Sequence, residues 1–128
     1  MKPRPALFWI LAAIGAITVA SGLLQLATPS TVLRFVGAEA TPTTMHFFGI
    51  VGMFMGLFGG LLLHALFSPA HHPAMVFWAS LQKFGASVAV GVGVLHHIFS
   101  GLALLVAGFD FLSGVLTLWY WFRIRSTA

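Results

Sequence analysis

The stretch Met45–Phe67, MHFFGIVGMFMGLFGGLLLHALF, decides the fold of this chain. It contains no Asp, Glu, Lys or Arg. At about 1.5 Å per residue, a helix of this length crosses a hydrocarbon core that is about 30 Å thick. The stretch therefore predicts a transmembrane helix.

Glycines recur along this predicted helix at helical spacing. Its expected packing residues are Gly49, Gly52, Gly56, Gly59 and Gly60. Membrane helices associate through close approach of their backbones, and Gly52, Gly56 and Gly60 form two overlapping GxxxG steps, which are typical of such contacts. The bulky Phe54 projects from roughly the opposite side. The pattern predicts that Gly56→Leu disrupts packing and that Phe54→Leu has a mild effect.

The composition extends this prediction to the whole chain. Hydrophobic residues make up 59% of the sequence and charged residues 6%, whereas about a quarter of the residues in ordinary soluble domains are charged. We expect one integral membrane domain, residues 1–128, with an all-α fold, a bundle of four transmembrane helices. The expected spans are 6–27, 45–67, 74–95 and 101–122. The first apolar run is longer than the core of a signal peptide, which favours an uncleaved first span.

Basic residues indicate the orientation of these spans. An even number of spans places both termini on one side, together with Lys2, Arg4, Arg123 and Arg125, while Arg34 lies in a connection on the other side. The positive-inside rule then places both termini in the cytoplasm and the chain in the bacterial inner membrane as a multi-pass protein. Because these bases lie near helix ends and form no clustered patch, nucleic acid is not an expected partner. The sequence has no cysteine, which excludes disulfides and thiolate chemistry.

Asp110 is the acid expected near the middle of the membrane. It lies on a stripe of small and polar residues in the fourth span, and a similar stripe in the third span includes Gln82. A charge at this depth costs at least about 2.5–3.5 kcal/mol on insertion scales. Asp110 therefore needs either a proton or a cation, and Lys83 lies within reach on the third span. A structural ion pair, proton or ion handling, and contact with a quinone or a lipid headgroup are the open alternatives.

Three histidines are candidate cofactor ligands. His46 begins the second span, and His96 and His97 follow the third span at the same face of the membrane. Neutral imidazoles from two helices are the ligands that haem or a chlorophyll-type pigment uses. The competing interpretation is that these side chains lie at the interface in contact with water. No metal site is predicted, because the set lacks further donors.

Several short motifs resemble those of DoxX-like small bacterial four-helix membrane proteins. The first span ends in Ala27-Thr28-Pro29, a surface turn ends in Phe35-Val36-Gly37, a glycine-rich span follows, and the last span has an Asp before Ser113-Gly114-Val115-Leu116. The resemblance implies a four-helix bundle. It implies no activity and no catalytic residues.

Small-residue helix faces outnumber chemically reactive groups in this sequence, and no catalytic signature is present. This pattern favours a small interaction or accessory subunit over an enzyme, within a larger inner-membrane assembly whose partners are the lipid bilayer and other membrane subunits or a second copy of the chain. Two alternatives stay open. One is a redox protein that binds haem, a pigment or a quinone, and the other is a small proton-coupled carrier centred on Asp110 and Lys83.

Overall fold

The computed structural model describes residues 3–126, and all of its regular structure is helical. Its helices are α1 (Ala6–Ala27), α2 (Pro29–Phe35), α3 (Pro42–Phe67), α4 (Pro73–Leu95) and α5 (Ala103–Ile124). Four of them, α1, α3, α4 and α5, are long and apolar enough to cross a membrane. The predicted all-helical fold with four long apolar helices is therefore confirmed.

Prolines and threonines explain where the helices begin. The α3 helix starts at Pro42, three residues before the predicted start, because Thr41 caps it. The Thr44 amide donates to the Thr41 hydroxyl at 3.1 Å, and the Thr41 amide donates to the Thr44 hydroxyl at 2.8 Å. This reciprocal capping satisfies amides that have no partner within the helix. Pro42 follows at the first helical position, where the missing amide of proline costs nothing.

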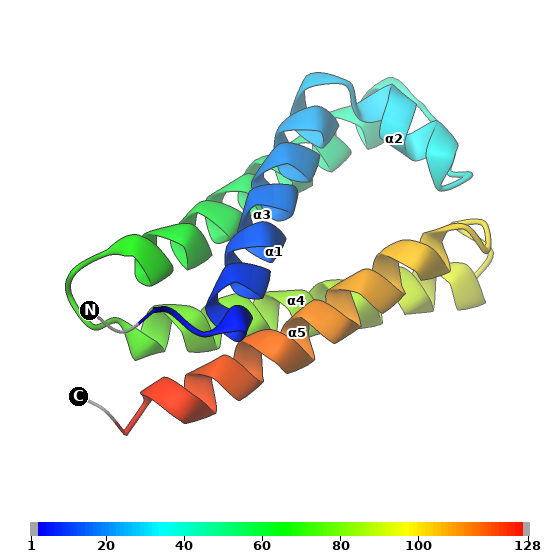
Figure 1. Cartoon of the computed structure of the whole chain (residues 1–128). Coiled ribbons are helices and arrows are strands. Elements are labelled where there is room, and N and C mark those ends of the chain that lie inside the picture. The colour runs from blue at the N-terminus through cyan, green and yellow to red at the C-terminus, as the bar shows by residue number, and fades with distance from the viewer. Residues whose placement is uncertain (1–2, 127–128) are drawn as a thin grey trace.

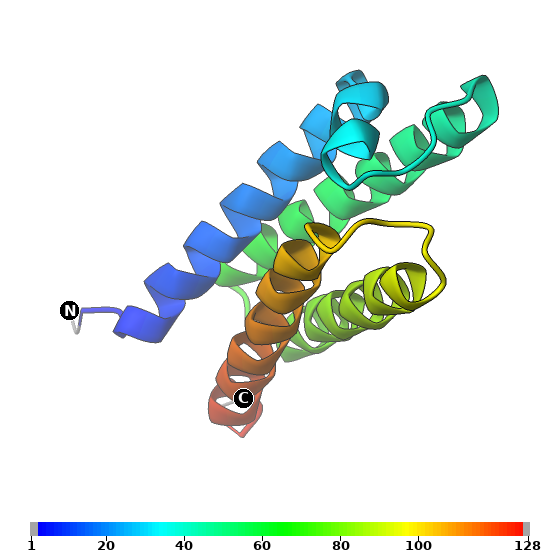
Figure 2. The ribbon, with the colours of Figure 1, turned by 90° about the vertical axis from the view of Figure 1, so that its right-hand side faces the viewer.

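The long helices form two pairs (Figures 1 and 2). The α1 helix packs on α3, and α4 packs on α5. The pairs meet at the end of the molecule where α1 begins and α5 ends, and they spread apart toward α2 (Figure 1). The main apolar core lies at the end where they meet, and its buried members are Leu7, Phe8, Leu11, Ile14, Leu62, Leu66 and Ala79.

Backbone-to-backbone contact joins α1 to α3 through glycines of both helices. A β-carbon at Gly52 would lie 2.7 Å from the carbonyl oxygen of Gly22. One at Gly59 would lie 2.9 Å from the carbonyl oxygen of Gly15. No side chain fits at such separations, so these glycines allow the close approach that membrane helices use.

The structure corrects part of the predicted glycine face. A β-carbon at Gly56 or Gly60 would meet no atom of another segment within 4 Å, counting the described residues 3–126. Gly49 makes only an ordinary contact, at 3.7 Å from the Leu26 carbonyl oxygen. The disruptive substitution predicted at Gly56 therefore belongs at Gly52 or Gly59, because the backbone of Gly56 lies near Gly22 but a β-carbon at Gly56 would point away from α1.

Hydroxyl groups join α4 to α5. Ser80 donates to the Gly114 carbonyl at 3.0 Å, and Ser87 donates to the Ala107 carbonyl at 2.9 Å. The face of α4 toward α5 thus carries Ser80 and Ser87. The sequence pattern predicts Gln82 on the inward-facing stripe of this helix. Gln82 is only half-buried, whereas Ser80 is fully buried. Interhelical hydrogen bonds of this kind stabilise packing where lipid offers no alternative partner.

A backbone hydrogen bond connects the two pairs at the end where they spread apart. The Ser100 amide, in the turn before α5, donates to the Val36 carbonyl at the end of α2 at 2.7 Å. Gly37 follows with a φ of 70°, and a β-carbon there would lie 2.7 Å from the Ser100 side chain. Both the left-handed backbone and the close contact require glycine at this position. The segment after α2 is thereby fixed to the turn between α4 and α5.

Candidate functional site

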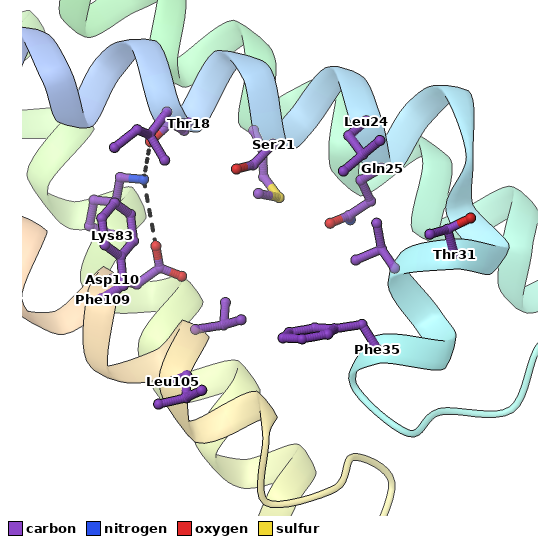
Figure 3. A pocket seen from close by; sticks show the side chains of 14 residues that line it. Thr18, Ser21, Leu24, Gln25, Thr31, Phe35, Lys83, Leu105, Phe109 and Asp110 are labelled. Carbon is purple, nitrogen blue, oxygen red and sulfur yellow. Dashed lines mark hydrogen bonds and ion pairs between the residues drawn. The ribbon is translucent and has the colours of Figure 1, made fainter.

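A buried ion pair lies between the two helix pairs. The Nζ atom of Lys83, on α4, is 3.5 Å from Oδ1 of Asp110, on α5. The two side chains are 5% and 10% exposed. Lys83 also donates a hydrogen bond to the hydroxyl oxygen of Thr18 on α1 (Figure 3). Three helices therefore converge on one ammonium group.

The local helix geometry orients the Thr18 hydroxyl. Its Oγ1 donates to the Ile14 carbonyl one turn earlier on α1, at 2.8 Å. The hydroxyl proton is thus used within α1, and a lone pair faces Lys83. The sequence predicts the pairing of Lys83 with Asp110 but not its contact with Thr18. The only sequence signal for that contact is that Thr18 is a polar residue within an apolar run. A charge inside hydrocarbon persists only when it is paired, and this ammonium has both a carboxylate and a hydroxyl.

A cavity of about 530 Å³ extends from this ion pair toward α2. Figure 3 shows Lys83 and Asp110 at one end of the cavity and Phe35 of α2 at the other. Its wall comes from α1, α2, α3, α4 and α5. The lining residues are Ile17, Thr18, Ser21, Leu24, Gln25, Thr31, Val32, Phe35, Met55, Lys83, Leu105, Val106, Phe109 and Asp110.

The cavity wall is mostly apolar, and it reaches the outer surface of the helices. Leu24 is 53% exposed, Phe35 52% and Leu105 67%. These side chains belong to α1, α2 and α5 and therefore mark the mouth of the cavity. Since α1 and α5 are long and apolar enough to cross a membrane, the mouth lies on an apolar surface of the molecule.

The polar groups of the cavity offer both hydrogen-bond donors and acceptors. Lys83 is a donor, the Asp110 carboxylate is an acceptor, and their formal charges cancel. Ser21 and Gln25 also point from α1 into the cavity (Figure 3). The Gln25 amide nitrogen donates to the Phe48 carbonyl on α3 at 2.9 Å, which fixes the side chain. The arrangement suits a molecule that is apolar over most of its length and has a neutral hydrogen-bonding group at one end.

The predicted histidine ligands are not part of this cavity. His46 is exposed near the start of α3, and His96 and His97 are exposed just after α4. Within residues 3–126, no group of three or more His, Asp or Glu side chains is arranged to hold a metal ion. The site gathers the predicted intramembrane residues Asp110 and Lys83, whereas the histidines lie elsewhere.

Comparisons with known proteins found no matching family model, no matching curated protein and no matching solved structure. The cavity and its ion pair therefore carry the evidence for function. They combine an apolar wall, a mouth among exposed apolar side chains and a polar end without net charge.

Proposed function

We propose that this chain is a membrane protein that binds a neutral, lipid-soluble molecule with a hydrogen-bonding polar end, such as a quinone, in the cavity between its helix pairs. The observation that carries the proposal is the Lys83–Asp110 ion pair at the end of an apolar cavity of about 530 Å³. This volume falls within the range of about 300–1,000 Å³ that is usual for small-molecule sites.

The charge balance at the ion pair favours a neutral ligand. An anionic headgroup would be attracted to Lys83 but repelled by Asp110, because the Asp110 carboxylate lies only 3.5 Å from the Lys83 ammonium nitrogen. A carbonyl group can accept a hydrogen bond from Lys83, and a hydroxyl group can donate one to the Asp110 carboxylate. The apolar remainder of the bound ligand would then lie along Leu105 and Phe35, and its end would extend through the mouth into lipid.

Filling the cavity tests this proposal. Val106 is half-buried and lines the cavity, whereas Val115 lies on the same helix, is 41% exposed and is not among the lining residues. Val106→Phe is expected to weaken binding of a short-chain benzoquinone at least about tenfold, because the new ring occupies ligand volume. Val115→Phe is the matched control and is expected to bind as the unmodified protein does. Equal affinities for the two variants, measured by titration in detergent, would contradict the proposal.

The second candidate is an accessory or self-associating subunit of a membrane assembly. It is favoured by Gly56 and Gly60, whose α-carbons have open space on the side where a β-carbon would lie. A neighbouring helix can approach closely at such positions. Gly60→Leu is expected to remove higher-order species on a native gel without changing the melting temperature. Assembly that is unchanged in this variant would count against a contact at Gly60.

The proposed location is the bacterial inner membrane, with both termini in the cytoplasm. The support is the distribution of bases, since Arg4, Arg123 and Arg125 lie at one end of the long helices and Arg34 follows α1 at the other end. A reporter enzyme that is active only in the cytoplasm should be active when fused to the C-terminus. Activity only of a periplasmic reporter at that position would reverse the topology.

A further inference from the structure

A second, smaller recess lies at the other end of the molecule, between the α3–α4 connection and the end of α5. Its volume is about 230 Å³, and its wall is mostly polar, unlike that of the main cavity. The polar side chains in its wall come from Ser68, His71, His72 and Tyr120. Because this volume is below the usual range of about 300–1,000 Å³ for drug-sized ligands, the recess suits a small polar group.

Hydrogen bonds fix the connection that forms this recess. The Ser68 hydroxyl lies 3.2 Å from Nε2 of His72 and accepts from the Ala70 amide at 3.3 Å. The His72 ring also lies against that of His64 on α3, with ring centroids 6.2 Å apart. The His72 imidazole is therefore held at the edge of the recess by contacts on two sides.

Three arginines lie at the same end of the molecule as the recess. Arg4 lies 5.5 Å from the ring of Phe67, the residue before Ser68, and within electrostatic range of Tyr120. Arg123 lies in the last turn of α5 and Arg125 directly follows this helix; their guanidinium groups pack on Trp119 and Trp121 and are not part of the recess wall. Neither acid of the sequence is near this end, because Asp110 is buried within the bundle and Glu39 lies in the connection before α3. An anion here would face imidazoles, with Arg4 nearby and without an opposing side-chain carboxylate.

The depth of the recess matches that of lipid phosphates. Tyr120 belongs to an aromatic group at the end of α5 that also includes Trp119 and Trp121, and such groups mark the membrane–water interface. Arg123 packs 4.8 Å from the Trp119 ring centre and Arg125 5.0 Å from that of Trp121. Basic and aromatic side chains therefore share the layer in which phosphate groups lie.

We propose that this recess binds the phosphate group of an anionic membrane lipid. The Tyr120 hydroxyl and the His71 imidazole supply hydrogen-bond donors. The Ser68–His72 pair uses one proton in its own hydrogen bond and supplies one further donor, and Arg4 supplies charge. The acyl chains lie outside the recess, against the apolar surface of α5. This site is independent of the cavity that contains Lys83, so that either assignment can fail without the other.

Thermal melts of the full-length protein in a neutral detergent test this site. Short-chain phosphatidylglycerol is expected to raise the melting temperature more than phosphatidylcholine does, because the choline cation of the latter opposes the basic surroundings. The double substitution His72→Gln with Tyr120→Phe is expected to raise the phosphatidylglycerol concentration that gives half of the melting-temperature shift at least about tenfold. His96→Gln, at the opposite end of α4, is the matched control and should retain the full response.

A melt with inorganic phosphate distinguishes binding of a lipid phosphate group from binding of a free phosphate ion. If phosphate ions alone reproduce the shift and the paired variant removes it, the recess binds free phosphate, which overturns the lipid assignment. Equal shifts with phosphatidylglycerol and phosphatidylcholine, or an unchanged response in the paired variant, also overturn the proposal. If the paired variant does not fold, His71→Gln at an exposed position takes its place, with the same weakening expected.

Discussion

Gly52→Ala is expected to lower the free energy of unfolding by about 1–3 kcal/mol or more, the usual cost of overpacking. The added β-carbon would lie 2.7 Å from the Gly22 carbonyl oxygen and 2.8 Å from the Leu26 amide nitrogen. Both are backbone atoms, so no side-chain rotation relieves the contact, and α1 must move away from α3. The measurement is thermal or chemical unfolding in detergent or in bicelles.

Gly60→Ala is the matched control for this substitution. It lies on the same helix, and its β-carbon would meet no atom of another segment within 4 Å among residues 3–126. Because alanine is the better helix former by about 0.8–1.0 kcal/mol, this variant is expected to be neutral or slightly stabilising. A loss of stability at Gly60 equal to that at Gly52 would show that α3 turns a different face to α1.

Asp110→Asn is expected to destabilise the fold by about 3–5 kcal/mol, the cost of leaving one member of a buried ion pair without its partner. The Lys83 ammonium would keep its contact with Thr18 but would lose the carboxylate that lies 3.5 Å from it. Its side chain is 5% exposed, so the ammonium group has little contact with bulk solvent once the carboxylate is lost. The readout is again unfolding of the full-length protein.

A double-mutant cycle separates the ion pair from other causes. Adding Lys83→Met to Asp110→Asn is expected to recover part of the stability, because the unpaired cation is then removed. If the carboxyl group were instead protonated and hydrogen-bonded, Asn would be nearly isosteric and the single variant would fold normally. Coupling below about 0.5 kcal/mol between the two positions would exclude the pair.

The transmembrane helices were predictable because apolar length alone defines a membrane span. The α1 range agrees with the structure at both ends, and α3 was predicted three residues too short at its start. That error arose because Thr41 caps α3, so that the helix begins at Pro42; hydropathy does not report this local effect. The short helix α2 occupies the segment where only a surface turn was expected.

The orientation of the helix faces was less predictable. The sequence shows two overlapping glycine registers in α3, and only the neighbour decides which one is used. The partner surface is formed by Gly15 and Gly22 on α1, seven residues apart, and their pairing with Gly59 and Gly52 depends on the crossing geometry. In α4 the prediction fails at Gln82, which is only half-buried, whereas the neighbouring Lys83 is buried.

At the candidate site the sequence predicted the Lys83–Asp110 pair and left proton or ion handling and contact with a quinone or a lipid headgroup open. Lys83 and Asp110 could be matched by depth, since an isolated charge at mid-membrane requires a partner. The cavity could not be predicted, because it arises from the spread of the two helix pairs and from the position of α2 across their open end. The DoxX-like resemblance, haem or pigment binding at the histidines and proton-coupled transport remain predictions.

Photoaffinity labelling tests the central claim, a ligand in the cavity beside the ion pair, most directly. The full-length protein is reconstituted in vesicles, irradiated with a short-chain azidoquinone and digested for mass spectrometry. We predict that the label concentrates on lining residues such as Phe35, Leu105 and Phe109, and that excess unlabelled quinone removes it. Label spread evenly over the lipid-facing surfaces of all four spans, without competition, would contradict a ligand site in this cavity.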